Sequence, residues 1–187
     1  LFKDEDLASG AAKRELYDTA REIFINAGYL EVGMDHFALP TDMLYQAAIA
    51  GIVHRNFMGY TTQNTNMLVG LGVSAISSTG RSFSQNVKTI HDYYSRLDND
   101  LLPLQKGYLL NDEDVRFGKY ILDISCRGKA RIDQVDWETV ETLCREELTT
   151  LEQDGLISIN GYEIQVTPTG KNFIRNICSA FDLYLQK

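Results

Sequence analysis

One short segment concentrates side chains with the chemistry to bind a ligand. Residues 55–62 (Arg-Asn-Phe-Met-Gly-Tyr-Thr-Thr) hold a base, an amide, two aromatic rings and two hydroxyls. We expect the segment to be a loop between a helix and a strand, and loops of this chemistry commonly contact ligands because a rigid scaffold holds them in place. A tight turn packed by Phe57 and Tyr60 explains the same residues without a ligand. The pattern alone favours neither interpretation.

The histidines are a second source of chemistry. His36 comes directly after an expected strand, where proteins built of βα units place working residues, and an imidazole can act as acid, base or ligand. A histidine held by a neighbouring carbonyl is the commoner alternative. With His54 and His91 the chain has three histidines and no H-x3-H or H-E-x2-H spacing. We therefore predict no metal site made by the protein alone.

The three cysteines do not form a recognisable ligand set. Cys126, Cys144 and Cys178 match neither C-x2-C nor C-x3-C-x2-C. This spacing argues against a disulfide framework, a zinc ribbon or a self-contained iron–sulfur site. We expect a reducing, cytoplasmic compartment.

A glycine-rich run resembles a nucleotide-binding fingerprint only loosely. Residues 70–75 (Gly-Leu-Gly-Val-Ser-Ala) fit G-x-G-x-x-A. The fingerprint needs a helix that opens at its third small residue, and none is expected here. We instead expect glycines that let a strand pass close to a bulky group.

Composition excludes several classes of protein. The chain has 187 residues, of which 44% are hydrophobic and 24% charged, as in an ordinary globular protein and unlike a disordered one. Its 26 acids against 18 bases give a net charge of −8, which argues against unassisted binding to nucleic acid or to an anionic membrane. We find no apolar run long enough to span a membrane and no signal peptide. The chain begins at Leu1 within a charged stretch, which suggests a fragment. We expect a monomer.

The first hundred residues alternate helical and extended patterns. The expected helices are 11–27, 41–51 with Thr41 as N-cap, and 86–97, and the expected strands are 29–34 and a strand buried on both faces at 66–77. This order predicts βα units of a parallel layer, the end of a larger sheet or barrel.

The sequence pattern changes near residue 100, where a turn-rich connector begins, and we place a domain boundary there. Beyond it we expect a helix from Asn111 to Cys126, a helix over 137–154, a hairpin and a last helix from Thr167 to Leu185. Strands 156–159 and 162–166 flank Asn160-Gly161, which predicts a type I′ turn. This order is that of a winged helix. The helix over 137–154 carries six acids and one base, which argues against DNA binding.

Several strings resemble one family, the oxygen-independent coproporphyrinogen III oxidases, which are radical S-adenosylmethionine enzymes of haem biosynthesis. They run in the family's order and cover nearly the whole chain: Ala27-Gly28-Tyr29, Gly33-Met34-Asp35-His36-Phe37-Ala38, His54-Arg55-Asn56-Phe57, Gly59-Tyr60-Thr61-Thr62-Gln63, the segment from Gly70 to Ser77, Arg175-Asn176-Ile177-Cys178, and Phe181-Asp182 with Tyr184-Leu185.

The resemblance implies an α/β region followed by an α region: the C-terminal portion of a partial (β/α) barrel over residues 1–100, then a mostly helical, winged-helix-like domain over 101–187. It implies the oxidative decarboxylation of coproporphyrinogen III to protoporphyrinogen IX, driven by a [4Fe–4S] cluster that cleaves S-adenosylmethionine. The family's C-x3-C-x2-C cluster motif is absent from this sequence. We therefore expect this chain to be an inactive fragment when alone.

The resemblance also implies site residues. Ile76 would pack against the adenosine of S-adenosylmethionine, with Phe57 and Met58 beside the cofactor and the reacting groups. Met58 stands where the family commonly has Gln, which removes a polar contact. The substrate's four propionates require cations, for which the candidates are His54, Arg55, Arg81 and Arg175, with His36 as a further contact; a surface ion pair is the alternative for Arg175. A stand-alone tetrapyrrole-binding module and, less favoured, a winged-helix regulator that binds DNA remain alternatives.

Overall fold

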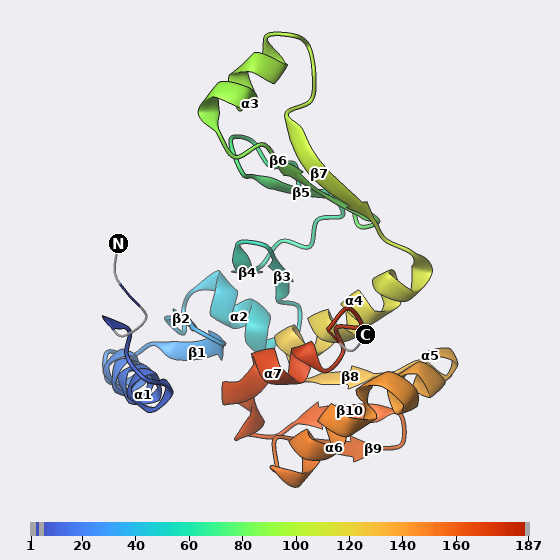
Figure 1. Cartoon of the computed structure of the whole chain (residues 1–187). Helices are drawn as coiled ribbons and strands as arrows, with labels where there is room; N and C mark the ends of the chain where they lie inside the picture. The colour runs from blue at the N-terminus through green and yellow to red at the C-terminus, as the bar shows by residue number, and fades with distance from the viewer. Residues whose placement is uncertain (1–2, 4–5, 186–187) are drawn as a thin grey trace.

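A computed structural model of the chain describes residue 3 and residues 6–185 (Figure 1). A C-terminal body of helices packed on a small sheet lies beside two short hairpins, and an arm that ends in α3 projects from them. Among the described residues, no helix is long and apolar enough to cross a bilayer.

The chain begins with a helix and a hairpin. Helix α1 (Gly10–Asn26) starts at Ser9, whose hydroxyl accepts from the Ala12 amide, and strands β1 (Leu30–Gly33) and β2 (His36–Ala38) pair antiparallel. The helix was predicted; β2 was not. No residue of α1 is buried, and Leu16 and Ile23 are 64% and 63% exposed. The apolar stripe is therefore mostly uncovered within the described chain, apart from Phe24, whose ring stacks on Phe37 with centroids 5.0 Å apart.

A short helix and a second hairpin follow. Helix α2 (Met43–Ile49) is capped by Asp42, not by Thr41 as predicted, because the Asp42 carboxylate accepts from the Leu44 amide at 2.7 Å. Strands β3 (His54–Asn56) and β4 (Gly59–Thr61) pair antiparallel. The segment predicted as a loop is thus a hairpin.

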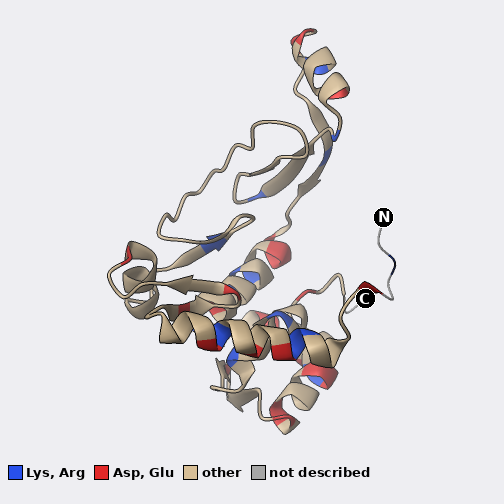
Figure 2. Cartoon of the chain, turned by 90° about the vertical axis from the view of Figure 1, so that its left-hand side faces the viewer, with Lys and Arg blue, Asp and Glu red and all other residues tan. Residues whose placement is uncertain are grey.

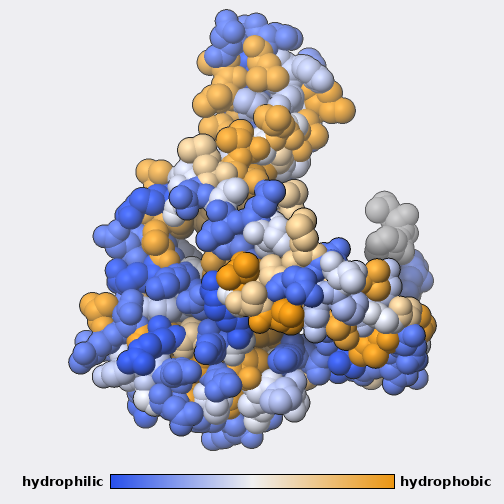
Figure 3. All heavy atoms as spheres, turned by 180° about the vertical axis from the view of Figure 1, so that it is seen from behind, coloured by the Kyte–Doolittle hydropathy of each residue, from blue (hydrophilic) through white to orange (hydrophobic). Residues whose placement is uncertain are grey.

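The arm consists of β5 (Ile76–Ser78), β6 (Ser82–Asn86), α3 (Ile90–Leu97) and β7 (Leu104–Leu109), with the strands in the order β5-β6-β7. The buried strand predicted over 66–77 is wrong. Gly72 and Ser74 have φ values of 98° and 61°, which interrupt an extended chain, and Leu71 is 84% exposed. The space-filling view shows apolar surface along the arm (Figure 3).

The predicted parallel layer is also not found. Every strand pair among the described residues is antiparallel. Short connections produce hairpins, whereas parallel neighbours need crossovers of about a dozen residues. The mixed α and β content is as predicted.

The C-terminal region begins at α4 (Asp112–Arg127), whose start at Asn111 is a capping box with Asp114. Strand β8 (Lys129–Arg131), which was not predicted, leads into a helical stretch composed of α5 (Gln134–Thr139), the π-helical turn η2 (Val140–Cys144) and α6 (Arg145–Gln153). Strands β9 (Ile157–Asn160) and β10 (Glu163–Val166), the 3-10 turn η3 (Gly170–Phe173) and α7 (Ile174–Ser179) complete the chain, and the sheet order is β8-β10-β9.

Two local predictions in this region need correction. Asn160 pairs with Glu163, so Gly161 and Tyr162 are the central residues of the hairpin turn. Of these only Gly161 has positive φ, at 60°, as a type II′ turn requires, so the predicted type I′ turn is wrong. The last helix is α7, which begins after Phe173 and ends at Ser179 rather than near Leu185, so the predicted cap at Thr167 is wrong. The Thr167 hydroxyl accepts from the Gly170 amide and so holds the start of the 3-10 turn η3 instead.

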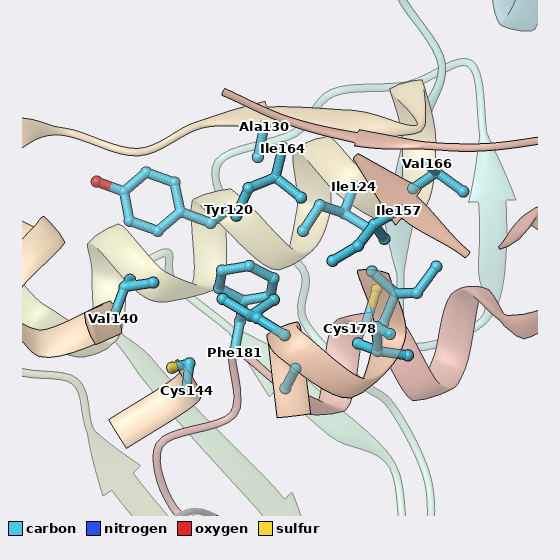
Figure 4. Packing of buried hydrophobic residues seen from close by; sticks show 14 of the residues in the cluster. Tyr120, Ile124, Ala130, Val140, Cys144, Ile157, Ile164, Val166, Cys178 and Phe181 are labelled. Atoms are coloured by element: carbon cyan, nitrogen blue, oxygen red, sulfur yellow. The ribbon is translucent and has the colours of Figure 1, made fainter. Parts of the chain in front are cut away.

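The main core lies in this C-terminal region. Side chains from α4, the three-stranded sheet and α7 interdigitate between the helices (Figure 4), and Ile124, Ile164, Ile177 and Phe181 have no exposed surface. Each such side chain contributes about 1.5–3 kcal/mol when buried. A smaller cluster of Ala47, Val53 and Tyr60 lies between α2 and the β3–β4 hairpin.

A buried carboxylate joins α4 to α5. Asp136 is 1% exposed and accepts hydrogen bonds from Arg116 Nε, at 2.9 and 2.8 Å, and from the Tyr120 hydroxyl at 2.8 Å. Burial alone would raise the pKa of Asp136, but the hydrogen bonds from Arg116 and Tyr120 outweigh it and hold the pKa below its usual value. The carboxylate therefore stays charged and fixes the start of α5 against α4.

We predict that Asp136→Asn lowers the free energy of unfolding by about 1–3 kcal/mol at pH 7, since a buried cation–carboxylate contact is lost. Because the pKa of Asp136 is lower in the folded chain, the advantage of the wild type is complete above the unfolded value and declines as pH falls below about 4. Urea unfolding at pH 7 and pH 3 measures both effects. The control is Asp133→Asn, whose side chain makes no capping hydrogen bond; equal midpoints for the two variants at pH 7 would contradict the assignment.

Candidate functional site

We use the name trench for a set of hollows whose linings overlap, from an apolar one to a cationic one. Four adjoining hollows make it up, and residues shared between neighbours connect them: Phe57 and Phe83 line the first and second, Arg55, Ile121 and Ser125 the second and third, and Met34 and Arg175 the third and fourth. The second hollow, of about 280 Å³, also contains His54, and the fourth, of about 340 Å³, contains Arg14 and Lys171.

The β3–β4 hairpin provides the centre of the trench. Phe57 and Met58 form its tip, which is fixed by the Asn56 carbonyl oxygen Oδ1 accepting from the Met58 amide at 2.9 Å. The Phe57 ring meets Phe83 of β6 edge-on, with centroids 5.2 Å apart. Met58 points to solvent with 81% exposure and lines none of the trench.

Ile76 lies at the apolar end. The Gly70 backbone passes so close to it that a Cβ at Gly70 would stand 2.6 Å from the Ile76 carbonyl oxygen. The Asn86 amide donates to the carbonyls of Gly70 and Gly72, at 3.1 and 2.8 Å, and holds the loop there. The glycines thus serve a close backbone approach, and no helix opens after them to receive a phosphate.

Arg55 carries the clearest chemical signal in the trench. Its Nε is buried and is without a hydrogen-bond partner among the described residues. Its guanidinium carbon lies 5.5 Å from the centroid of the Tyr60 ring. A buried N–H of a cation that lacks an acceptor costs about 1–3 kcal/mol or more, so Arg55 is suited to receive an anionic acceptor.

Tyr60 positions Arg55. Its buried hydroxyl donates to the Ser125 carbonyl at 2.7 Å, one of the last carbonyls of α4, which have no partner within the helix. Burial raises the pKa of Tyr60 to about 12, so the hydroxyl remains a donor at neutral pH. The hairpin and its arginine are thereby attached to the main core.

The histidines take different places. The His36 ring packs edge-on against the Tyr60 ring, with centroids 5.1 Å apart, and His36 Nδ1 lies within hydrogen-bond distance of Asp35 Oδ1, at 3.0 Å. His36 lines none of the trench. His54 does line the trench, but burial and then the charge of Arg127 lower its pKa. At neutral pH His54 therefore offers a neutral imidazole rather than the expected cation.

The two remaining arginines also differ. Arg81 lies outside the trench and pairs with Asp112. Arg175, on α7, lines the third and fourth hollows. Its charge adds to the lowering of the pKa of Asp35; burial opposes that shift, and the hydrogen bonds from the Asp35 backbone and His36 are the larger causes.

The structure thus brings Phe57, Ile76, His54, Arg55 and Arg175 together and leaves Met58, Arg81 and His36 outside the trench. Sequence reasoning missed Phe83, Ser125, Met34 and Lys171. Phe83 lies on strand β6, a segment for which the sequence predicted no element, and Ser125 and Lys171 reach the trench only through tertiary packing.

The described residues contain no group of three or more His, Cys, Asp and Glu side chains placed to hold a metal ion. Cys144 and Cys178 are buried, and burial raises the pKa of each thiol to about 11, which disfavours the thiolate that ligates iron. The described residues therefore do not fit an iron–sulfur cluster.

We predict that Tyr60→Phe lowers the free energy of unfolding by about 0.5–1.5 kcal/mol, since the Ser125 carbonyl loses its partner. Thermal or urea unfolding measures this, with Tyr94→Phe on the exposed arm as the control, because Tyr94 is 59% exposed. An unchanged stability in Tyr60→Phe would mean that the hydroxyl does not attach the hairpin to α4.

Comparison with known proteins gives a consistent result. The oxygen-independent coproporphyrinogen III oxidase of Salmonella typhimurium is 38% identical over the whole chain, and that of Pseudomonas aeruginosa is 37% identical over 97% of it. The chain matches the C-terminal part of oxygen-independent coproporphyrinogen III oxidases. The resemblance inferred from the sequence strings is thereby confirmed.

A solved structure agrees. Coproporphyrinogen III oxidase from Escherichia coli, described as a radical SAM enzyme, superposes with a TM-score of 0.87 at 36% identity over 98% of this chain. The chain spans 42% and 41% of the length of the Salmonella and Pseudomonas relatives and 44% of the solved chain. No family model matches the chain.

Proposed function

We propose that this chain forms the C-terminal part of an enzyme for the oxygen-independent oxidative decarboxylation of coproporphyrinogen III to protoporphyrinogen IX, and that the trench holds the substrate. The observation that carries the proposal is the buried, unpartnered Arg55 Nε at the centre of a trench that is apolar at one end and cationic at the other. The names of the relatives supply the substrate class.

The chemistry of the substrate fits this polarity. Coproporphyrinogen III combines an apolar macrocycle with four propionate carboxylates. A protein of net charge −8 repels such a ligand unless cations are gathered locally. Arg55 and Arg175 are the cations we assign to it, because a guanidinium can bind a carboxylate through two parallel hydrogen bonds.

The apolar end suits an adenine ring. We assign Ile76 and Phe57, together with Phe83, to the adenosine of S-adenosylmethionine, since these side chains line one hollow. When bound with its cluster, S-adenosylmethionine supplies the radical that begins the oxidation of a propionate. The residues here contribute apolar packing and exclude water. Met58 adds no polar contact, and the cluster ligands belong outside the described chain.

The fold proposal follows the same relatives. We place the chain's contribution to the end of a (β/α) barrel in residues 1–100. The described strand pairs of this region are all antiparallel, so the parallel strands of that barrel belong to another segment of the enzyme. We place a winged-helix-like domain in 101–187. The sheet order β8-β10-β9 with α4, α5 and α6 supports the second part, while β7 extends the first part's sheet past residue 100. Two of the chain's three cysteines are buried, and none of the three forms a disulfide. Free thiols fit a protein of the reducing cytoplasm, which is the compartment we propose. We also propose that the protein is a monomer and that it binds no nucleic acid.

Binding of coproporphyrin III, the fluorescent oxidised form of the substrate, tests the site in the 187-residue chain. We expect Arg55→Gln to weaken binding about tenfold or more, since a buried charge-assisted contact contributes about 1.5–3 kcal/mol. Arg145→Gln is the matched control: it removes the same charge from α6, where Arg145 pairs with Glu141 of the preceding η2 turn. Equal affinities in Arg55→Gln and wild type would assign Arg55 a structural role, and no binding by the wild type would contradict the site.

We also predict that the 187-residue chain alone does not convert the substrate, because no described residues hold the cluster. The assay is anaerobic turnover with reductant and S-adenosylmethionine, followed by product fluorescence after oxidation. Turnover by this chain would overturn the assignment of the cluster ligands to another segment.

A further inference from the structure

The cationic end of the trench is a cleft lined by Arg14 and Tyr17 of α1 on one side and by residues of η3 and α7 on the other. Arg14 of α1 reaches across to η3, with its guanidinium carbon 5.9 Å from the centroid of the Phe173 ring. Lys171 and Arg175 line the opposite wall. None of the residues on this wall except Arg175 was a candidate from the sequence.

Lys171 of η3 and Arg175 of α7 are four residues apart, carry the same charge and line the same cleft. Neither side chain has an ion pair or hydrogen bond to any described residue. The pair is thus left with its full hydrogen-bonding capacity toward the cleft.

Asp35 is the carboxylate that lines this cleft among the described residues, and it lies 3.0 Å from His36 Nδ1. Asp18, which does not line the cleft, binds Arg14 through both of its oxygens at 2.9 Å. Figure 2 shows α1 with both signs of charge along its length, as expected for a helix that pairs its own charges. Lys171 and Arg175 therefore supply the positive charge of the cleft that no carboxylate contacts.

Neutral donors flank the two cations. Asn172 and Asn176 line the same cleft, and their side chains form no hydrogen bond with the described residues. The single hydrogen of the Tyr17 hydroxyl is shared between two acceptors, the Met34 carbonyl at 3.0 Å and the Glu31 carboxylate at 3.2 Å, so Tyr17 has no donor left for the cleft. Ammonium, guanidinium and amide groups together suit a carboxylate, which accepts several hydrogen bonds at once.

We propose that Lys171 and Arg175 form a distal carboxylate subsite, which binds one acid group of the ligand while Arg55 binds another. This proposal rests on the proposed function. Met34 and Arg175 line both the third and the fourth hollow, so the trench continues from Arg55 into the distal subsite. A ligand that carries several carboxylates can therefore engage both positions.

The test is titration of coproporphyrin III at low ionic strength into wild type, Lys171→Gln and Lys171→Arg. We expect Lys171→Gln to weaken binding about fivefold, as the loss of one partly exposed charge contact predicts, and Lys171→Arg to retain the wild-type affinity. The matched control is Lys119→Gln, from an exposed position on α4 that lines none of the trench. Melting temperatures of the variants confirm that each is folded.

A double variant separates the two positions. If Arg55 and Lys171 hold different carboxylates, the fold losses of Arg55→Gln and Lys171→Gln multiply in the double variant. A parallel titration with inorganic phosphate distinguishes a ligand carboxylate from a free anion. Loss of phosphate binding alone, with unchanged porphyrin affinity in Lys171→Gln, would overturn the proposal in favour of a free-anion site.

Failure of this proposal differs from failure of the proposed function. Tenfold weaker porphyrin binding in Arg55→Gln with wild-type binding in Lys171→Gln overturns the distal subsite alone. Absence of porphyrin binding by the wild type overturns both.

Discussion

The hydrogen bond from the Tyr60 hydroxyl to the Ser125 carbonyl joins two parts of the chain that pack very differently. On one side is a dense core built around α4, and on the other are hairpins whose own cluster is small. The bond uses a carbonyl that the end of α4 leaves free, so it satisfies a polar group rather than displacing another bond. The Tyr60 ring also contacts the guanidinium of Arg55 and the imidazole ring of His36. The centre of the trench depends on this one side chain.

Local signals were sufficient for much of the fold. The glycine after α1, the capping box at Asn111 and the glycine in the β9–β10 turn act within a few residues, and the elements beside them lie where the sequence predicts. Parallel pairing failed as a prediction because it depends on long-range partners. A run such as residues 66–77 is apolar enough for a buried strand, yet its left-handed residues turn it into a loop.

The site was predictable only where motif strings carried it. Arg55 and Phe57 stand in a segment whose chemistry was evident, and Ile76 and Arg175 came from family resemblance. Lys171 and Ser125 carry no local signal, because a lysine or serine on a helix surface is ordinary until another element is placed opposite it. Arg81 shows the reverse case. An arginine is a reasonable candidate for binding an anionic ligand, but in the folded chain Arg81 forms an ion pair with Asp112.

The arm has a consequence for dynamics. Helix α3 buries none of its residues and β7 is exposed along its whole length, so few contacts resist local opening of this segment. Its Phe83 ring nevertheless forms one wall of the trench against Phe57. A molecule lodged between those rings restrains the arm as well as itself, and part of its binding free energy is spent on lost conformational entropy. Binding of such a molecule is therefore expected to slow hydrogen exchange of the arm's backbone amides.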